Sequence, residues 1–246
     1  MEKKNLIGLS KEEFVSQIEE LGEKHFRANQ LWEWIYNKGA KSFSQMTNIS
    51  KSLREDLETI FHLDRPKISV AKKSFDGTSK WLLKLKDSNE IETVHIPEEG
   101  RGSLCISSQV GCSLTCKFCH TGTQVMVKNL SAEEIVGQFM LARDELSDWP
   151  SKKEQRIISN VVMMGMGEPL LNYDNVAQAI KIIMDGEGLA LSKRRITLST
   201  SGIVPFIEKC GHELGVNLAI SLHAVNDELR NELVPINKKI PIKRIA

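Results

Sequence analysis

Three of the five cysteines stand close together in the sequence, as Cys112, Cys116 and Cys119, in the spacing CxxxCxxC. Random placement would give this spacing on the order of 0.002 times per chain, so chance is a poor explanation. An odd number of cysteines argues against a disulfide framework and toward metal or redox chemistry. Three thiolates on a [4Fe-4S] cube would leave one iron without a protein ligand, and that iron could bind a substrate.

Other interpretations of the three cysteines stay open. They could be buried structural thiols, although Ser113, Thr115 and Lys117 make the segment polar. A zinc site would need four ligands, and His120 is the only adjacent candidate for the fourth. A fully ligated iron-sulfur electron carrier would need a fourth cysteine, for which only Cys105 is available nearby.

Four ordered motifs surround the cysteines, namely LCISSQVGC at 104–112, MGMGEPLLN at 164–172, RRITLSTSG at 194–202 and LAISLHA at 218–224. With Phe118 before the last cysteine, they resemble the radical S-adenosylmethionine (SAM) superfamily. Within it, the chain resembles the dual-specificity RNA methyltransferases, which methylate C2 of adenine in 23S rRNA and in the tRNA adenosine next to the anticodon. The resemblance runs from about residue 5 to the end of the chain.

The resemblance implies a role for each motif residue. Cys112, Cys116 and Cys119 would hold a [4Fe-4S] cluster whose open iron binds SAM. The SAM pocket would be lined by residues that follow successive strands, namely Gly167, Glu168, Ser199, Ser221, Leu222 and His223. Glu92 would accept a proton, and Cys105 would be the thiol that resolves a protein–RNA crosslink by forming a disulfide with a methyl-carrying cysteine.

Several of these residues also have a simpler interpretation. Glycines such as Gly167 often serve only a turn, and a serine or histidine at a strand end is more often a hydrogen-bonded core residue. Glu92 alternates with Val94 and Ile96, which predicts a carboxylate on an apolar face, where burial would raise its pKa and suit proton abstraction. Alternatively, Glu92 lies on an edge strand and reaches solvent.

Local patterns predict the elements that position these residues. Residues 1–65 read as a helical accessory domain: Ser10 and Glu13 form a capping box, a second helix fits 29–37, and Ser50 begins a third. Residues 66–98 alternate with period two around turns at 76–77 and 87–89, which predicts an antiparallel β-meander that links the domains.

Residues 99–246 read as the radical SAM core. Apolar runs at 104–107, 157–164, 195–199 and 217–222 alternate with amphipathic helices at 131–146, 173–184, 204–212 and 227–233. This order predicts an α/β fold with a parallel sheet and its reactive loops at the carboxyl ends of the strands. A barrel normally needs more units, so we expect an incomplete (β/α) barrel in a fragment whose C-terminal strands and methyl-carrying cysteine are missing.

Composition bounds the partners. Lys and Arg total 33 against 32 Asp and Glu, so RNA would have to meet local clusters such as 193–195, 238–239 and 243–244. No apolar run reaches the roughly 20 residues that span a bilayer, which favours a soluble cytoplasmic protein. We expect a monomer that binds 23S rRNA and tRNA and receives electrons from a flavodoxin-like donor. The alternatives are an adenine-C8 methyltransferase, a non-catalytic iron-sulfur carrier and a zinc-containing RNA-binding module.

Overall fold

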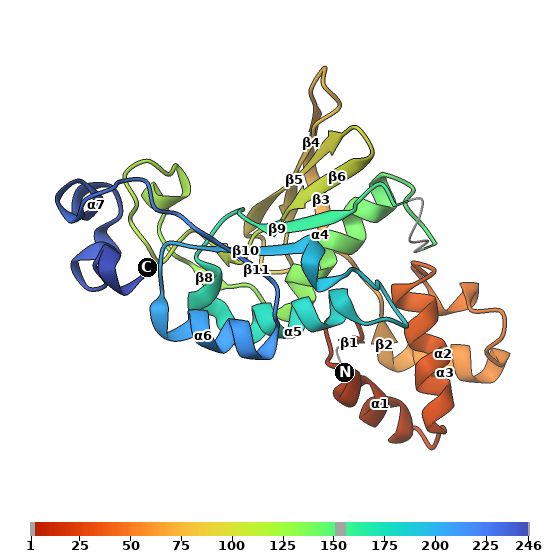
Figure 1. Cartoon of the computed structure of the whole chain (residues 1–246). Coiled ribbons are helices and arrows are strands. Elements are labelled where there is room, and N and C mark those ends of the chain that lie inside the picture. The colour runs from red at the N-terminus through yellow and green to blue at the C-terminus, as the bar shows by residue number, and fades with distance from the viewer. Residues whose placement is uncertain (1–2, 151–155, 246) are drawn as a thin grey trace.

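The computed structural model describes residues 3–150 and 156–245, and its centre is one seven-stranded sheet (Figure 1). The strands lie in the order β11-β10-β9-β6-β5-β4-β3. The sheet therefore joins a parallel half, β6 to β11, to an antiparallel half, β3 to β5, through the pairing of β5 with β6. The meander predicted at 66–98 is thus continuous with the sheet of the core.

The parallel half consists of β6 (Arg101–Cys105), β9 (Asn160–Met163), β10 (Ile196–Thr200) and β11 (Asn217–Ile220). Helices α4 (Ala132–Glu145), α5 (Tyr173–Met184) and α6 (Val204–Glu213) lie along one side of it in Figure 1. Alternate strand residues are buried in the core: Leu104, Val161, Met163, Ile196 and Leu198. The other face of the parallel strands carries the residues that alternate with these.

The antiparallel half consists of β3 (Lys67–Lys73), β4 (Ser79–Lys84) and β5 (Glu90–Glu98). The turn that contains Gly77, whose φ is +87°, joins the first two strands, as the Asp-Gly pair predicts. Edge strand β3 is exposed along most of its length and has a register shift between Ile68 and Val70. A bulged, lysine-bearing edge is one that resists pairing with another sheet.

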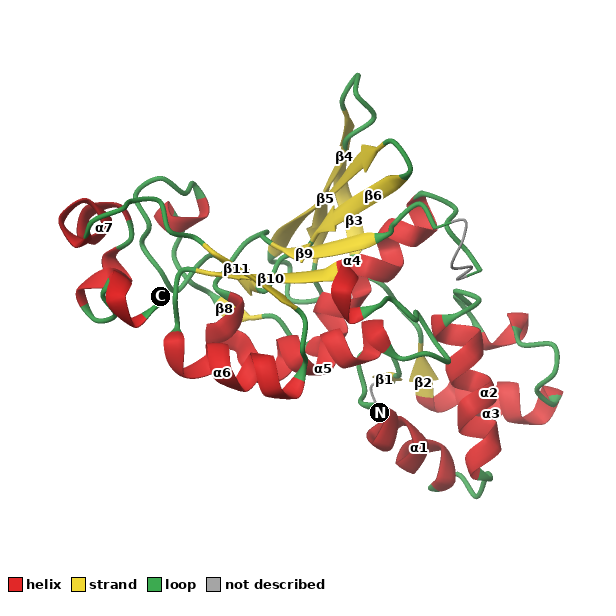
Figure 2. Cartoon of the chain, viewed as in Figure 1, coloured by secondary structure: helices red, strands yellow, loops and turns green. Residues whose placement is uncertain are grey.

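The N-terminal residues form a small module of three helices, seen apart from the sheet in Figure 2. Helices α1 (Lys11–Glu19), α2 (His25–Tyr36) and α3 (Lys51–Ile60) are accompanied by the two-residue parallel strands β1 (Lys4–Asn5) and β2 (Phe61–His62). The predicted capping box at Ser10 and Glu13 is confirmed. The core of the module includes an aromatic pair, in which Trp32 packs edge-on against Phe14 at 5.2 Å between ring centroids.

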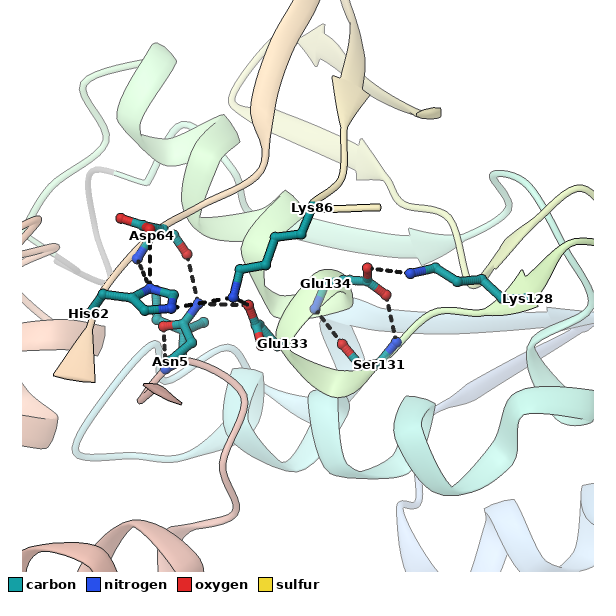
Figure 3. A network of polar contacts seen from close by, with 9 residues as sticks. Asn5, His62, Asp64, Lys86, Lys128, Ser131, Glu133 and Glu134 are labelled. Carbon is teal, nitrogen blue, oxygen red and sulfur yellow. Dashed lines mark hydrogen bonds and ion pairs between the residues drawn. The ribbon is translucent and has the colours of Figure 1, made fainter. Parts of the chain in front are cut away.

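A network of polar contacts fixes the module to the rest of the chain (Figure 3). The buried Asn5 donates from Nδ2 to the carbonyl of Asp64 and to Glu133 at the start of α4, at 2.9 and 2.8 Å. Lys86, which follows β4, reaches the same Glu133 carboxylate at 3.2 Å. The apolar core is likewise continuous from Leu6 through Leu214. The module is therefore packed on the sheet and its helices, and is not a loose appendage.

The remaining described elements are short. Helix α7 (Asp227–Leu233) follows β11 and is capped by the Asn226 side chain, as the prediction of 227–233 requires. The strand pair β7 (Gln109–Val110) and β8 (Lys128–Asn129) brackets the cysteine segment. Among the described residues, no helix has the length and apolar character needed to cross a membrane.

Candidate active site

A cavity of about 260 Å³ lies beyond the carboxyl ends of the parallel strands, where such sheets place their sites. Its walls come from the cysteine segment and from the loops after β9, β10 and β11. The site residues predicted from the sequence that line it are Cys112, Cys116, Cys119, Gly167, Glu168, Ser199, Ser221 and His223. The fold therefore brings together residues that are scattered over more than one hundred positions of the chain.

The three cysteines face this cavity from a tight loop. Cys116 is buried, whereas Cys112 and Cys119 are half-buried. The amide of Leu114 donates to the Cys112 sulfur at 3.4 Å, and the hydroxyl of Ser201 lies 4.0 Å from the Cys116 sulfur. Burial raises the pKa of the Cys112 and Cys116 thiols. A bound metal would offset the free-energy cost of forming these buried thiolates, because the thiolate is the form that binds a metal.

The donor set fits a multi-iron cluster better than a single ion. Among the described residues, no three His, Cys, Asp or Glu side chains form a group that could hold one metal ion. His120, the adjacent candidate for a fourth zinc ligand, is exposed and does not line the cavity. A [4Fe-4S] cube presents a separate iron to each thiolate, so it requires three thiols around one cavity, which is what the loop provides.

The glycine-rich turn after β9 packs directly on the start of the cysteine segment. Gly167 has a φ of +100°, and a Cβ there would lie 2.6 Å from the Cβ of Gln109 and 2.8 Å from its backbone nitrogen. The buried Gln109 side chain in turn accepts from the amides of Glu168, at 3.0 Å, and Ser113, at 3.2 Å. Gln109 thus sets the distance between the turn and the cysteine loop. The sequence analysis did not identify this role of Gln109.

Glu168 is almost fully buried and lines the cavity. Its carboxylate accepts the amide of Ser201 at 2.8 Å and that of Leu170 at 3.2 Å. Burial raises the pKa of Glu168, while the hydrogen bond from Ser201 opposes that rise. The Thr200 side chain also bonds to this carboxylate. A carboxylate has about four lone-pair sites, so these three bonds leave about one to accept from a bound ammonium group.

The strand ends after β10 and β11 supply the opposite wall. Ser199 and Ser221 are half-buried, and His223 stacks on Phe118 of the cysteine segment with ring centroids 3.7 Å apart. His223 has a φ of +57°, a left-handed conformation that non-glycine residues adopt infrequently. Leu222 departs from the prediction. It does not line the cavity, its side chain is 41% exposed, and its carbonyl accepts from Arg230.

Glu92 lies on a different face from the one expected. The buried residues of β5 are Ile91, Thr93 and His95, so the expectation of a buried Glu92 is wrong. Its side chain is 43% exposed and forms an ion pair with Lys80 at 2.5 Å. Two-residue periodicity defines the two faces of a strand but does not say which one meets the core.

Cys105, at the end of β6, shares the half-exposed face of the sheet with Glu92. Burial and, to a smaller extent, the nearby Glu92 carboxylate raise the pKa of its thiol to about 11, against the opposing effect of a hydrogen bond with the Met164 backbone. Cys105 does not line the cavity of the other three cysteines, so it does not supply the fourth ligand that an electron carrier would need. All five cysteines are free thiols.

Two buried residues that the sequence did not single out connect the walls of the cavity. Ser201 donates its amide to Glu168, and its carbonyl accepts from the guanidinium of Arg230 at 2.7 Å. Arg230 is fully buried, although α7 is a short helix of seven residues. The serine-rich run at the end of β10 was a usable signal for Ser201, whereas nothing local distinguishes Arg230 from a surface arginine.

A parallel sheet with three cysteines and a glycine-rich turn at its carboxyl edge defines a radical SAM protein, and the family model "Radical SAM superfamily" matches residues 106–245. The model "Ribosomal RNA large subunit methyltransferase N-terminal domain" matches residues 4–63. The chain belongs to the radical SAM superfamily. A solved structure of a radical SAM methyltransferase from Sphaerobacter thermophilus agrees, with a TM-score of 0.90, 38% identity and coverage of 98% of this chain and 70% of that one.

Curated relatives carry the name "Dual-specificity RNA methyltransferase RlmN". One from Rhodospirillum rubrum is 59% identical over 98% of this chain and 56% of its own length. Another from Paramagnetospirillum magneticum is 57% identical over 99% of this chain and 54% of its own length. The chain therefore spans little more than half the length of these relatives.

Proposed function

We propose that this chain is the SAM-cleaving part of an enzyme that methylates C2 of adenine in 23S rRNA and in tRNA. The observation that carries the proposal is the single cavity in which three cysteines, the Gly167–Glu168 turn and the ends of β10 and β11 meet. The relatives are named as RNA methyltransferases of dual specificity, and we extend that activity to this chain.

Each wall of the cavity has a proposed task. Cys112, Cys116 and Cys119 would hold a [4Fe-4S] cluster, which supplies one electron to cleave SAM. The buried Glu168 would accept from the SAM ammonium group, a charge-assisted hydrogen bond that a neutral side chain could not match. The open backbone at Gly167 lets a ligand approach closely.

Glu92 and Cys105 would act on the RNA side of the reaction. The Glu92 carboxylate is half-exposed and held by Lys80, so it is reachable by a substrate and can accept a proton. Cys105 would resolve the crosslink as a thiol that its environment keeps protonated until it is needed. Their shared face of the sheet supports a joint role.

The remaining partners follow from the proposed chemistry. A cluster that donates one electron per cleavage needs a one-electron donor, for which we propose a flavodoxin-like protein. The proposed substrates, 23S rRNA and tRNA, place the activity in the cytoplasm.

Anaerobic reconstitution with iron and sulfide tests the proposal, followed by spectroscopy of the reduced cluster with and without SAM. We expect a [4Fe-4S] signal that shifts when SAM is added. Cys112→Ala should lose the cluster, whereas Cys210→Ala should keep it, because Cys210 is buried in α6 and does not line the cavity. Zinc without iron, or a cluster indifferent to SAM, would contradict the proposal.

A further inference from the structure

Arg230 is a buried cation beside the cavity, with an exposed fraction of 0%. Its guanidinium clamps the loops that follow two neighbouring strands. Nη2 donates to the carbonyls of Ser201 and Ser221 at 2.7 and 3.1 Å, and Nε donates to that of Leu222 at 3.0 Å. Nη1 donates to the side-chain oxygen of Asn237 at 2.7 Å. The side chain thus ties the ends of β10 and β11 to the segment after α7.

Among the described residues, no carboxylate bonds directly to this guanidinium, and Asp227 acts on its charge only from beyond Asn237. Within residues 3–150 and 156–245, all four of these hydrogen-bond acceptors are neutral oxygens, and no ion pair involves Arg230. The acidic side chain of Asp227 lies beyond Asn237, which donates to it at 2.8 Å, and Asp227 is exposed to solvent. Burying a charge without a directly bonded opposite charge costs free energy, so a buried cation of this kind indicates that an anion binds nearby in the functional protein.

The cavity of the three cysteines is the place where such an anion would lie. Ser201, whose carbonyl binds Arg230, has its hydroxyl 4.0 Å from the sulfur of Cys116. The chain packs there as well: Leu233 and Val234, which follow Arg230, contact the cysteine segment.

We propose that Arg230 is a positioning residue of the cluster site, which supplies the positive charge opposite the anionic iron-sulfur cluster and fixes the strand ends that face SAM. The inference rests on the proposed function, because it needs a cluster at Cys112, Cys116 and Cys119. A cluster bound by three thiolates becomes more negative when it is reduced. A nearby fixed cation therefore stabilises the reduced form and raises the reduction potential.

Three variants separate this electrostatic role from a merely structural one. Arg230→Lys keeps the charge but loses most of the carbonyl bonds, whereas Arg230→Gln removes the charge. The third, the exchange variant, carries Asp227→Asn and Asn237→Asp in one chain, so that the two side chains exchange places. It leaves the composition, the net charge and Arg230 itself unchanged, but brings a carboxylate to the position 2.7 Å from Nη1. An Asn at 227 can still donate to that carboxylate, so the 2.8 Å contact is kept with its direction reversed.

The measurement is the midpoint potential of the reconstituted cluster, from a redox titration followed by electron paramagnetic resonance, together with the dissociation constant for SAM. We expect the potential to fall in Arg230→Gln and in the exchange variant, and to stay near the wild-type value in Arg230→Lys. We expect Arg230→Lys to bind SAM at least several-fold more weakly, because the strand ends lose their clamp. If Arg230→Gln does not fold, the exchange variant still decides the matter.

Equal potentials in the wild type and in the exchange variant would overturn the role of Arg230 while leaving the proposed function intact. If Arg230→Lys lowers the potential as much as Arg230→Gln does, the effect comes from lost structure and the electrostatic role is likewise refuted. A wild-type chain that assembles no [4Fe-4S] cluster would overturn the proposed function first, and this inference with it.

Discussion

Replacing Gly167 by alanine tests the packing of the glycine turn against the cysteine segment. The new Cβ would meet the Cβ and backbone nitrogen of Gln109 at 2.6 and 2.8 Å, and the φ of +100° strains any residue with a side chain. Backbone strain of this kind costs about 1–3 kcal/mol, and overpacking costs a further ~1–3 kcal/mol. For a chain of this size, a destabilisation of about 4 kcal/mol lowers the melting temperature by roughly 8–16 °C.

The assay is thermal unfolding of the apo-protein, with iron loading measured on the same samples. Iron loading should fall too, because Gln109 accepts the amide of Ser113 beside Cys112. Gly211→Ala is the matched control: its Cβ meets nothing within 4 Å in α6, so the helix should gain up to about 1 kcal/mol. A melting temperature of Gly167→Ala equal to that of the wild type would refute the reasoning.

Three further predictions concern residues outside the cavity. At neutral pH, Cys105 should react with iodoacetamide about 100-fold more slowly than an ordinary thiol, because its pKa is raised to about 11. Glu92→Gln should speed the reaction. Peptide mass spectrometry measures the rates, and equal rates for Cys105 and an ordinary thiol would contradict the prediction. Burial lowers the pKa of His95 from 6.5, although the charge of Asp148 acts to raise it, so the unfolded chain binds the proton more tightly than the folded chain does. Urea unfolding should therefore show that the free energy of unfolding decreases as pH falls below 6.5, and that it decreases less in His95→Leu. Asn5→Ala should cost about 1–3 kcal/mol in the same assay, since it leaves the amide of Ile7 without its acceptor, whereas Lys4→Ala on the exposed neighbour should be near neutral.

Local signals in the sequence predicted the helices of the core well. The expected bounds 173–184 and 227–233 agree with α5 and α7, and the helix predicted at 131–146 is α4, which a capping box of Ser131 and Glu134 begins. Caps and helical periodicity act within a few residues, so they can be read without the tertiary structure. The two-residue strands β1 and β2 carry no such pattern, and they were missed because only their pairing defines them.

Features of the site that depend on distant contacts could not be predicted in the same way. The three cysteines and the glycine turn were found because their spacing is unusual, yet the cavity they share with Ser221 exists only through the order of the strands. The exposure of Glu92 depends on which side of β5 meets α4, where Thr93 bonds to Gln138 at 2.9 Å. The buried guanidinium of Arg230 donates to four oxygen acceptors from three separate segments, and none of these segments adjoins it in the sequence.

One apolar core runs from Leu6 to Leu214, and the cysteine segment packs on Val234 in a second, smaller cluster. A ligand that binds only the folded cysteine loop stabilises the N-terminal helices as well, to the extent that the loop and the helices unfold in one transition. By mass action, a ligand at a hundredfold excess over its dissociation constant adds about 2.7 kcal/mol to the unfolding free energy. The buried indole of Trp32, far from the cavity in the sequence, would then report cluster and SAM binding through the temperature at which its fluorescence changes.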